Sequence, residues 1–207
     1  MKFTNLFTAA FVALVAASPV EIAKRTAVQT LATFDDLKAV PAISQINPVG
    51  NYKGLNYRSF NVLQPGVLGV VQVAGIKPQS SPNVAANSIT GTVLTGSPAL
   101  IVNSQYTSFD LQSLYLACVV NSASSVAGVP QQCTIAFTAY KAGSKTAFQT
   151  INKQFDPTNA VLSNMVKTTF PSSWNKLQRV EVAAVQATST EPLNAVFIDS
   201  VSYKLTK

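Results

Sequence analysis

Two segments, FDLQSLYLAC at residues 109–118 and CTIAFTAY at residues 133–140, decide the fold class of this chain. The second places Ile135 and Phe137 on one face and threonines on the other. This period of two residues is typical of a half-buried β-strand. The first alternates in the same way and becomes apolar on both faces toward Cys118. Both segments therefore predict long β-strands.

The residues between these strands, 121–132, are rich in Ser, Ala, Gly and Pro and predict a loop. Two long strands joined by one loop predict a hairpin, with Cys118 and Cys133 at its two lips. In an oxidising compartment an even pair of cysteines most simply forms a disulfide, and two buried free thiols are the alternative. Closing a loop of about 15 residues would stabilise the fold by roughly 3 kcal/mol.

Other segments rich in β-branched and aromatic residues predict further strands, separated by Gly, Pro, Asn and Ser. They are residues 28–34, 57–63, 67–73, 88–95, 145–155, 177–186 and 195–205. No segment predicts an amphipathic helix longer than about two turns. Many short strands with turn signals between them indicate an all-β fold, an antiparallel jelly-roll β-sandwich.

The N-terminus predicts secretion. Lys2 precedes an uncharged apolar run from Leu6 to Ala17, which has the layout of a cleaved signal peptide and is too short to span a membrane. An N-terminal buried helix is the alternative. The next segment ends in Lys24 and Arg25, a dibasic pair of the kind that secretory proteases cut. The expected organisation is a signal peptide at residues 1–17, a pro-segment at 18–25 and a single β-sandwich domain at 26–207.

Charge and composition narrow the range of partners. The domain from Thr26 onward has 12 basic and 7 acidic residues, a net charge of +5, and the basic residues are scattered singly along the sequence. Nucleic-acid binding would favour clustered basic residues with aromatics between them, so we expect no nucleic-acid partner. No later segment is apolar enough to insert into a membrane. A mildly basic secreted monomer could instead adhere to acidic glycans or to a cell wall.

Four segments carry a family resemblance: TFDDL at 33–37, GLNYRSF at 54–60, the strands at 109–116 and 133–143, and FIDSVSY at 197–203. In this order they resemble secreted fungal and bacterial proteins of the galactose-binding-like, carbohydrate-binding-module-like β-sandwich type. Those proteins open with an FDDL-like strand, continue with G-x-L-x-W/Y-x-x-F and close with an I/L-D-x-V strand. This chain departs from the pattern at Tyr57, where Trp is common, and at Lys53, in a turn that is often uncharged. The resemblance implies a galactose-binding-like fold, and relatives of this type include carbohydrate-binding modules.

The sequence is poor in catalytic groups. It contains no histidine, which removes Ser-His and Cys-His nucleophile systems and His-based zinc sites. Seven carboxylates remain in the domain for acid–base chemistry. Asp35 and Asp36 are adjacent, so on an extended strand they would point to opposite faces and could not flank one bond. We therefore expect a protein that is not an enzyme, and a glycan-cleaving enzyme is the less favoured alternative.

Three of these carboxylates suggest a structural calcium ion as the one cofactor. In the sandwiches that this sequence resembles, the first and last strands lie close together, and calcium often sits near their ends. Asp35 or Asp36 would then meet Asp199, and main-chain carbonyls would complete the hard oxygen ligands that calcium prefers. The alternative, which we favour, is that Asp35 caps a turn and that Asp199 accepts hydrogen bonds from backbone amides.

Aromatic side chains in turn-like segments are candidates for a sugar-binding surface, because rings stack on the apolar faces of sugars. They are Tyr52, Tyr106 and Trp174, and core packing is the favoured alternative for Trp174. The leading hypothesis is a secreted protein, extracellular or cell-wall-associated, that binds a polysaccharide or cell-wall glycan. The alternative is a secreted structural or interaction protein, such as an effector, with no sugar site. A row of exposed rings would favour the first, and burial of every ring would favour the second.

Overall fold

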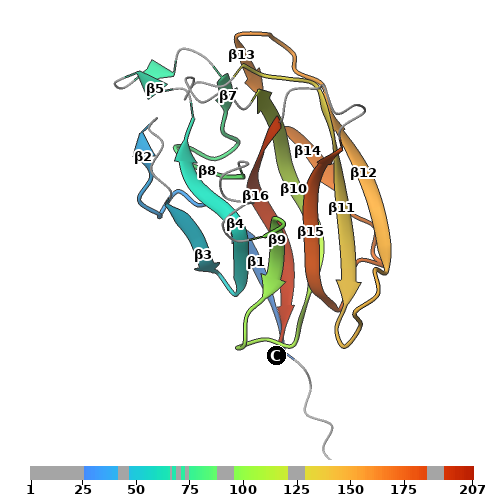
Figure 1. The fold of residues 1–207 in the computed structure, drawn as a ribbon. Coiled ribbons are helices and arrows are strands. Elements are labelled where there is room, and N and C mark those ends of the chain that lie inside the picture. The colour runs from blue at the N-terminus through green and yellow to red at the C-terminus, as the bar shows by residue number, and fades with distance from the viewer. Residues whose placement is uncertain are drawn as a thin grey trace, which may run out of the picture.

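The computed structural model describes residues 26–41, 47–65, 67–68, 71–72, 75–87, 96–120, 129–185 and 194–207. Every regular element in these ranges is a β-strand, so the predicted all-β class is confirmed (Figure 1). Within the same ranges, no helix is long and apolar enough to span a membrane. The strands are β1 (Ala27–Ala32), β2 (Val40–Pro41), β3 (Pro48–Tyr52), β4 (Leu55–Gln64), β5 (Val67–Leu68), β6 (Val71–Gln72), β7 (Gly75–Lys77), β8 (Val84–Asn87), β9 (Ala99–Val102), β10 (Ser108–Val120), β11 (Cys133–Lys141), β12 (Gln149–Phe155), β13 (Leu162–Asn164), β14 (Val166–Thr169), β15 (Leu177–Val185) and β16 (Asn194–Thr206).

Several sequence predictions fall on other parts of the chain. The signal peptide at 1–17, the pro-segment at 18–25, the strand at 88–95 and most of the loop at 121–132 lie outside the described residues. The predicted strand at 67–73 corresponds in part to the short antiparallel pair β5 and β6.

Most strands belong to one 12-stranded sheet. Its main path runs β12-β11-β15-β9-β4-β8-β16-β10-β14, while β1 pairs with β16, and β2 and β3 pair with β4. Because Phe109 of β10 also pairs with Leu177 of β15, the path from β15 to β10 closes on itself. The result is an arrangement between a β-sandwich and a barrel, in which the long strands run side by side along the molecule (Figure 1). The pairings are antiparallel except for β2 with β4 and β7 with β13.

The alternation that predicted β11 is confirmed by burial. Ile135 and Phe137 are fully buried, whereas Thr134 and Thr138 on the other face are partly exposed. In β10 the register to β16 shifts between Leu111 and Tyr115. This bulge explains why the buried positions change from Phe109 and Leu111 to Leu114 and Leu116, since a shift of one residue exchanges the side of the strand that faces the core. Beyond it, residues 116–119 are buried on both faces, as the apolar sequence there predicts.

The prediction that β10 and β11 form one long hairpin is wrong. They pair beside the loop, where Val119 bridges Pro130 and the Gln131 amide donates to the Cys118 carbonyl (3.0 Å). Beyond this point β10 pairs with β14 and β16, and β11 pairs with β12 and β15. Each strand therefore uses both of its hydrogen-bonding edges for other partners, and the two separate into different parts of the sheet.

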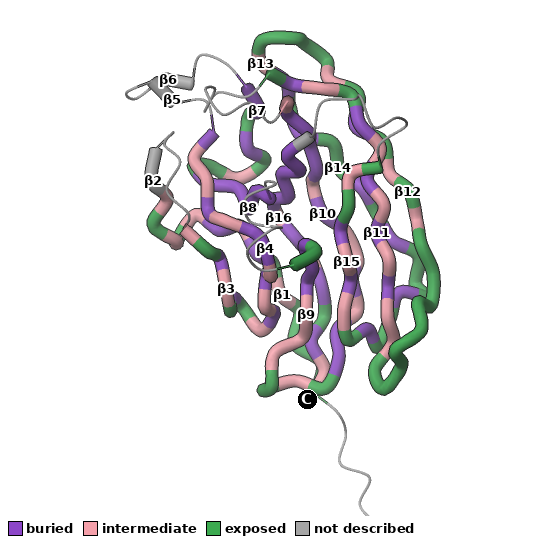
Figure 2. Tube along the Cα trace, viewed as in Figure 1, coloured by how far each residue is buried: buried purple, intermediate pink, exposed green. Residues whose placement is uncertain are grey.

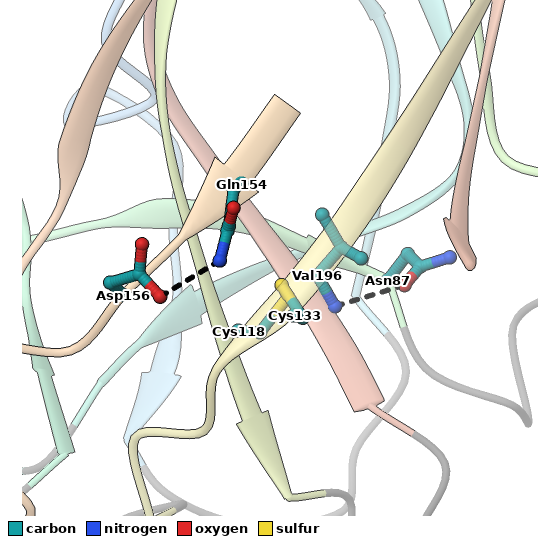
Figure 3. Close-up of a disulfide and its surroundings, with 6 residues drawn as sticks. All are labelled: Asn87, Cys118, Cys133, Gln154, Asp156 and Val196. Carbon is teal, nitrogen blue, oxygen red and sulfur yellow. Dashed lines mark hydrogen bonds between the residues drawn. A yellow bond between two sulfur atoms is a disulfide. The ribbon is translucent and has the colours of Figure 1, made fainter. Parts of the chain in front are cut away.

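The disulfide between Cys118 and Cys133 is confirmed, and it links the two strands where they separate (Figure 3). The two Cα atoms are 6.2 Å apart, within the usual range for a disulfide. Both residues are buried. Nearby, the Val196 amide donates to Asn87 Oδ1 (3.2 Å), which ties β16 to β8. The cystine therefore joins the β16 side of the sheet to the β15 side.

The core runs between these strands and is closed by aromatic rings. Buried residues line β16 and β10, and exposed residues gather at the β11–β12 turn (Figure 2). Phe34 packs edge-on against Tyr57, with 5.1 Å between ring centroids. Near the start of β15, Trp174 stacks on Phe170 with a centroid distance of 4.7 Å. The two ring pairs therefore pack at different places in the core, one beside the turn after β1 and one before β15.

Candidate functional site

Asp199 is a buried charged residue in the middle of β16, with 0% exposure. Its carboxylate accepts hydrogen bonds from the Ser80 amide (2.7 Å) and the Ser80 hydroxyl (2.9 Å). It also accepts from the amide of Ser200, which is itself in the left-handed conformation (φ 47°). The two Ser80 donors therefore connect the carboxylate to the segment that precedes β8.

Burial raises the pKa of Asp199 to about 6, because the charged form loses water. The hydrogen bonds from Ser80 and Ser200 favour the charged form and oppose this shift, while the Asp35 carboxylate adds to it. At neutral pH the group is therefore mainly ionised and hydrogen-bonded.

The carboxylates of Asp35 and Asp36 accept hydrogen bonds from different parts of the fold. The Asp35 carboxylate accepts a hydrogen bond from the backbone N–H of Asn83 (3.0 Å). The Asn83 side chain in turn donates to the Leu37 carbonyl (2.8 Å), so that it fastens the turn after β1. Asp36 instead accepts from the Tyr52 hydroxyl, and this hydrogen bond lowers the pKa of its carboxyl. The structure thus brings Asp35 toward Asp199 and takes Asp36 to a separate partner.

The predicted calcium site at Asp35, Asp36 and Asp199 does not fit this donor set. Both oxygens of Asp199 already accept hydrogen bonds, and a cation would have to displace Ser80. In the described part of the chain, no three His, Cys, Asp or Glu residues are grouped so as to hold a metal. The hydrogen-bonding alternative matches the observed geometry. Because Asp199 is closed to solvent, it also cannot act with Asp35 on a substrate in an open groove.

The three aromatic candidates lie in different environments. Tyr52 and Trp174 are buried, with 7% and 1% exposure, and neither ring presents a face for sugar stacking. Tyr52 packs on Phe34, and the Trp174 indole nitrogen donates to Gln149 Oε1 (2.8 Å). Both rings belong to the core. The Tyr52 candidate is therefore corrected, whereas Trp174 follows the favoured alternative of core packing. Tyr106 alone of the three remains partly exposed.

Tyr106 lies at the end of the sandwich where β3, β9, β11 and β16 finish and β4, β10, β12 and β15 begin. The registers place these termini together, since Thr206 pairs with Ser108, and Leu177 pairs with both Phe109 and Lys141. Five exposed lysines occupy this end: Lys53, Lys145, Lys176, Lys204 and Lys207. We call the surface formed by these lysines and Tyr106 the lysine end.

The Tyr106 ring lies close to Gly54 and to Lys207. Gly54, in a left-handed conformation (φ 90°), packs so closely that an added Cβ would lie 2.9 Å from Tyr106 Cε2. The Lys207 ammonium lies 5.9 Å from the ring centroid. The neighbouring Thr107 donates through its amide to the Thr206 carbonyl (2.8 Å), which ties the loop to β16. The ring is therefore a fixed part of the surface.

Few carboxylates balance the lysine end. Asp110 accepts from the Lys176 backbone amide (2.8 Å) and is the cross-strand partner of Lys204. Asp36 lies near enough to Lys53 for the ammonium to lower the pKa of its carboxyl. The ion pairs of the described residues join arginines to Glu181 and include no lysine. The lysine charges are thus largely uncompensated.

A second polar surface, on the outer face of β11 and β15, consists of side chains that mainly contact one another. The Arg179 guanidinium lies 3.9 Å from the centroid of the Tyr140 ring. The Tyr140 hydroxyl donates to Glu181 Oε2 (3.0 Å), and Glu181 pairs with Arg179 (3.3 Å). Arg58 donates through Nε to the Ser97 carbonyl (2.9 Å). These groups mainly hold one another and leave the lysine end as the better candidate site.

No family model matches the chain, and no curated protein matches it in sequence. Among solved structures, the chain is similar to the crystal structure of a DUF4465 family protein from Bacteroides caccae. The TM-score is 0.53, and the match covers 85% of this chain and 98% of the other. The two share a fold. At 7% sequence identity, the similarity says nothing about ligand or activity.

Sequence reasoning missed the lysine end because its residues are far apart along the chain. A usable signal was present: each lysine lies beside the start or the end of a predicted strand. The signal could be read only with the strand order, which brings these particular strand ends to one side of the molecule.

Proposed function

We propose that this protein is secreted, extracellular or cell-wall-associated, and binds a polysaccharide without cleaving it, through the lysine end around Tyr106. The finer fold type that goes with this proposal is a galactose-binding-like jelly roll, as the sequence resemblance implies. We further propose that the protein is a monomer and that no metal takes part.

The observation that carries the proposal is the setting of Tyr106. Its ring is partly exposed, fixed by Gly54, and flanked in the same loop by Asn103, Gln105 and Thr107. The Asn103 side chain accepts from the Gln105 amide (3.1 Å), which orders the loop. A ring that stacks on a sugar face, beside amides and hydroxyls that contact its rim, is the usual arrangement of a sugar site.

The test is a pull-down on insoluble polysaccharides. The full-length chain is expressed in a secreting host and the protein is recovered from the medium, where N-terminal sequencing should give a start at Thr26. We expect retention on at least one polysaccharide, and a loss of roughly tenfold in affinity for Tyr106→Ala, comparable to the loss of one stacked ring. Tyr115→Ala, which removes a partly exposed ring from β10 outside the lysine end, should bind like the wild type.

The second candidate is a secreted interaction protein with no sugar site. The observation in its favour is the burial of Tyr52 and Trp174, which leaves no row of exposed rings among the described residues. Retention on no polysaccharide, with a folded and secreted protein, would favour this candidate over the first.

A further inference from the structure

The fold brings to the lysine end five lysines that are far apart in the sequence. Lys204 and Lys207 come from the end of β16, Lys176 precedes β15, Lys145 lies in the β11–β12 turn and Lys53 in the β3–β4 turn. The other exposed lysines of the described residues are Lys38, Lys77 and Lys167, which lie on separate elements away from this end.

These lysines lie at strand ends that the registers bring to the same end of the fold as Tyr106. Lys53 directly precedes Gly54, which packs against the Tyr106 ring, and the Lys207 ammonium approaches the same ring. Lys204 lies opposite Asp110, whose carboxylate accepts the Lys176 amide. An anionic chain that stacks on Tyr106 would therefore lie near the Lys207 ammonium and at the same end as the other four lysines.

Two lysines at this end also make structural contacts. The Lys53 ammonium donates to the Leu31 carbonyl (3.0 Å), although the residue remains exposed. Lys141 is only partly exposed and is excluded from the binding set. Its ammonium donates to the carbonyls of Ser173 (2.6 Å) and Asn175 (2.5 Å) and lies 4.2 Å from the centroid of the Phe148 ring. These contacts tie the Trp174 loop to β11. The Phe148 side chain remains 45% exposed, so a lipid surface is tested as an alternative partner.

We infer that the ligand of the lysine end is an acidic polysaccharide that carries carboxylate or sulfate groups, an inference that rests on the proposed function. Exposed cations at this end are all lysines, whose compact ammonium groups attract anions without demanding a fixed geometry. Arginine is the residue that recognises phosphates by paired hydrogen bonds. Both arginines of the domain instead contact Glu181 on the other polar surface. Spread lysines around one ring suit a chain of repeating, singly charged sugars.

The experiment compares two charge-matched variants. Lys176→Gln/Lys204→Gln/Lys207→Gln removes three charges from the lysine end, and Lys38→Gln/Lys77→Gln/Lys167→Gln removes three exposed charges elsewhere. Binding to soluble polygalacturonate, a sulfated glucan and an uncharged glucan is measured from low to moderate salt. Vesicles of anionic and of zwitterionic lipid form a separate arm.

We expect the wild type to bind the two acidic polymers with an affinity that falls as salt increases. The lysine-end triple should lose roughly tenfold or more in affinity and show a weaker salt dependence, while the other triple keeps most of its binding.

Four outcomes would overturn the inference. Equal losses in the two triples would mean that net charge alone acts. Binding to the uncharged glucan with no effect of the lysine-end triple would leave the proposed function intact but refute the acidic ligand. Binding to anionic vesicles without binding to either acidic polymer would replace the polysaccharide by a lipid surface. Binding to none of the polymers would refute the inference together with the proposed function.

Discussion

Asp199 and Lys204 both belong to β16 and lie five residues apart in the sequence, but Asp199 is buried and Lys204 is exposed. Asp199 is closed to solvent, and Ser80 and Ser200 donate to its carboxylate. Lys204 is exposed at the strand end, among other lysines that no carboxylate pairs with in the described residues. The difference separates two uses of charge: a buried group needs partners to be tolerated, whereas exposed, unpaired groups cost little and remain available to a ligand.

The largest effect on stability is expected for Asp199→Ala. The change leaves the Ser80 and Ser200 donors without their acceptor in the interior, so the free energy of unfolding should fall by about 3–4 kcal/mol. Denaturant unfolding measures this. Asp156→Ala, at an exposed carboxylate that accepts only side-chain amides, is the control and should change stability by less than about 0.5 kcal/mol. A loss below about 1 kcal/mol for Asp199→Ala would mean that the cluster does not hold β16 to the Ser80 segment.

The pH dependence of stability should depend on the same group. The folded pKa of Asp199 is raised to about 6 from an ordinary value of 3.8. The folded state therefore holds this proton more tightly, and the associated stability is present below about pH 4 and is lost as the pH rises through 6. Between pH 4 and 8 the wild type should lose up to about 3 kcal/mol relative to Asp199→Asn, which does not titrate. Parallel stability profiles for the two proteins would contradict the raised pKa.

At the lysine end, Gly54→Ala should lower the stability of the fold. The backbone there is left-handed, and an added Cβ would lie 2.5 Å from Leu205 Cδ1. Gly96→Ala is a matched control, because Gly96 has a similar φ of 85° and nothing within 4 Å of the added atom. We expect losses of about 2–3 kcal/mol for Gly54→Ala and about 1 kcal/mol for Gly96→Ala. Equal losses would show that the Tyr106 ring is not packed as described.

The smallest effect is expected for the lysine-end triple. Since its side chains form no ion pairs in the described residues, Lys176→Gln/Lys204→Gln/Lys207→Gln should change the free energy of unfolding by less than about 0.5 kcal/mol. Thermal or denaturant unfolding without ligand checks this. A clear destabilisation would give these lysines a structural role and weaken their assignment to binding.

Sequence alternation predicted which faces are buried but not which strands are neighbours. Ile135 and Phe137 were placed in the core correctly, because the side-chain period of a strand depends on its own residues. The long hairpin between β10 and β11 was wrong, because partner choice depends on every other strand that competes for the same edges. The disulfide was still predicted correctly, because the short pairing beside the loop is enough to bring Cys118 and Cys133 together.

The candidate sites show the same division. The hydrogen-bonding role of Asp199 followed from the cost of burying a carboxylate in an apolar strand, a local argument. Exposure of Tyr52, Tyr106 and Trp174 could not be read from turn-like context, because a turn can fold its ring into the core, as Pro171 to Trp174 does. The lysine end depends on strand order and had no local signature.

The most direct test is a thermal-shift measurement with and without polygalacturonate on three proteins: the wild type, the lysine-end triple and the Lys38→Gln/Lys77→Gln/Lys167→Gln triple. A ligand that binds only the folded state raises the Tm. Binding at the lysine end predicts a rise in Tm for the wild type and for the control triple, and none for the lysine-end triple. The same rise in all three proteins would contradict it.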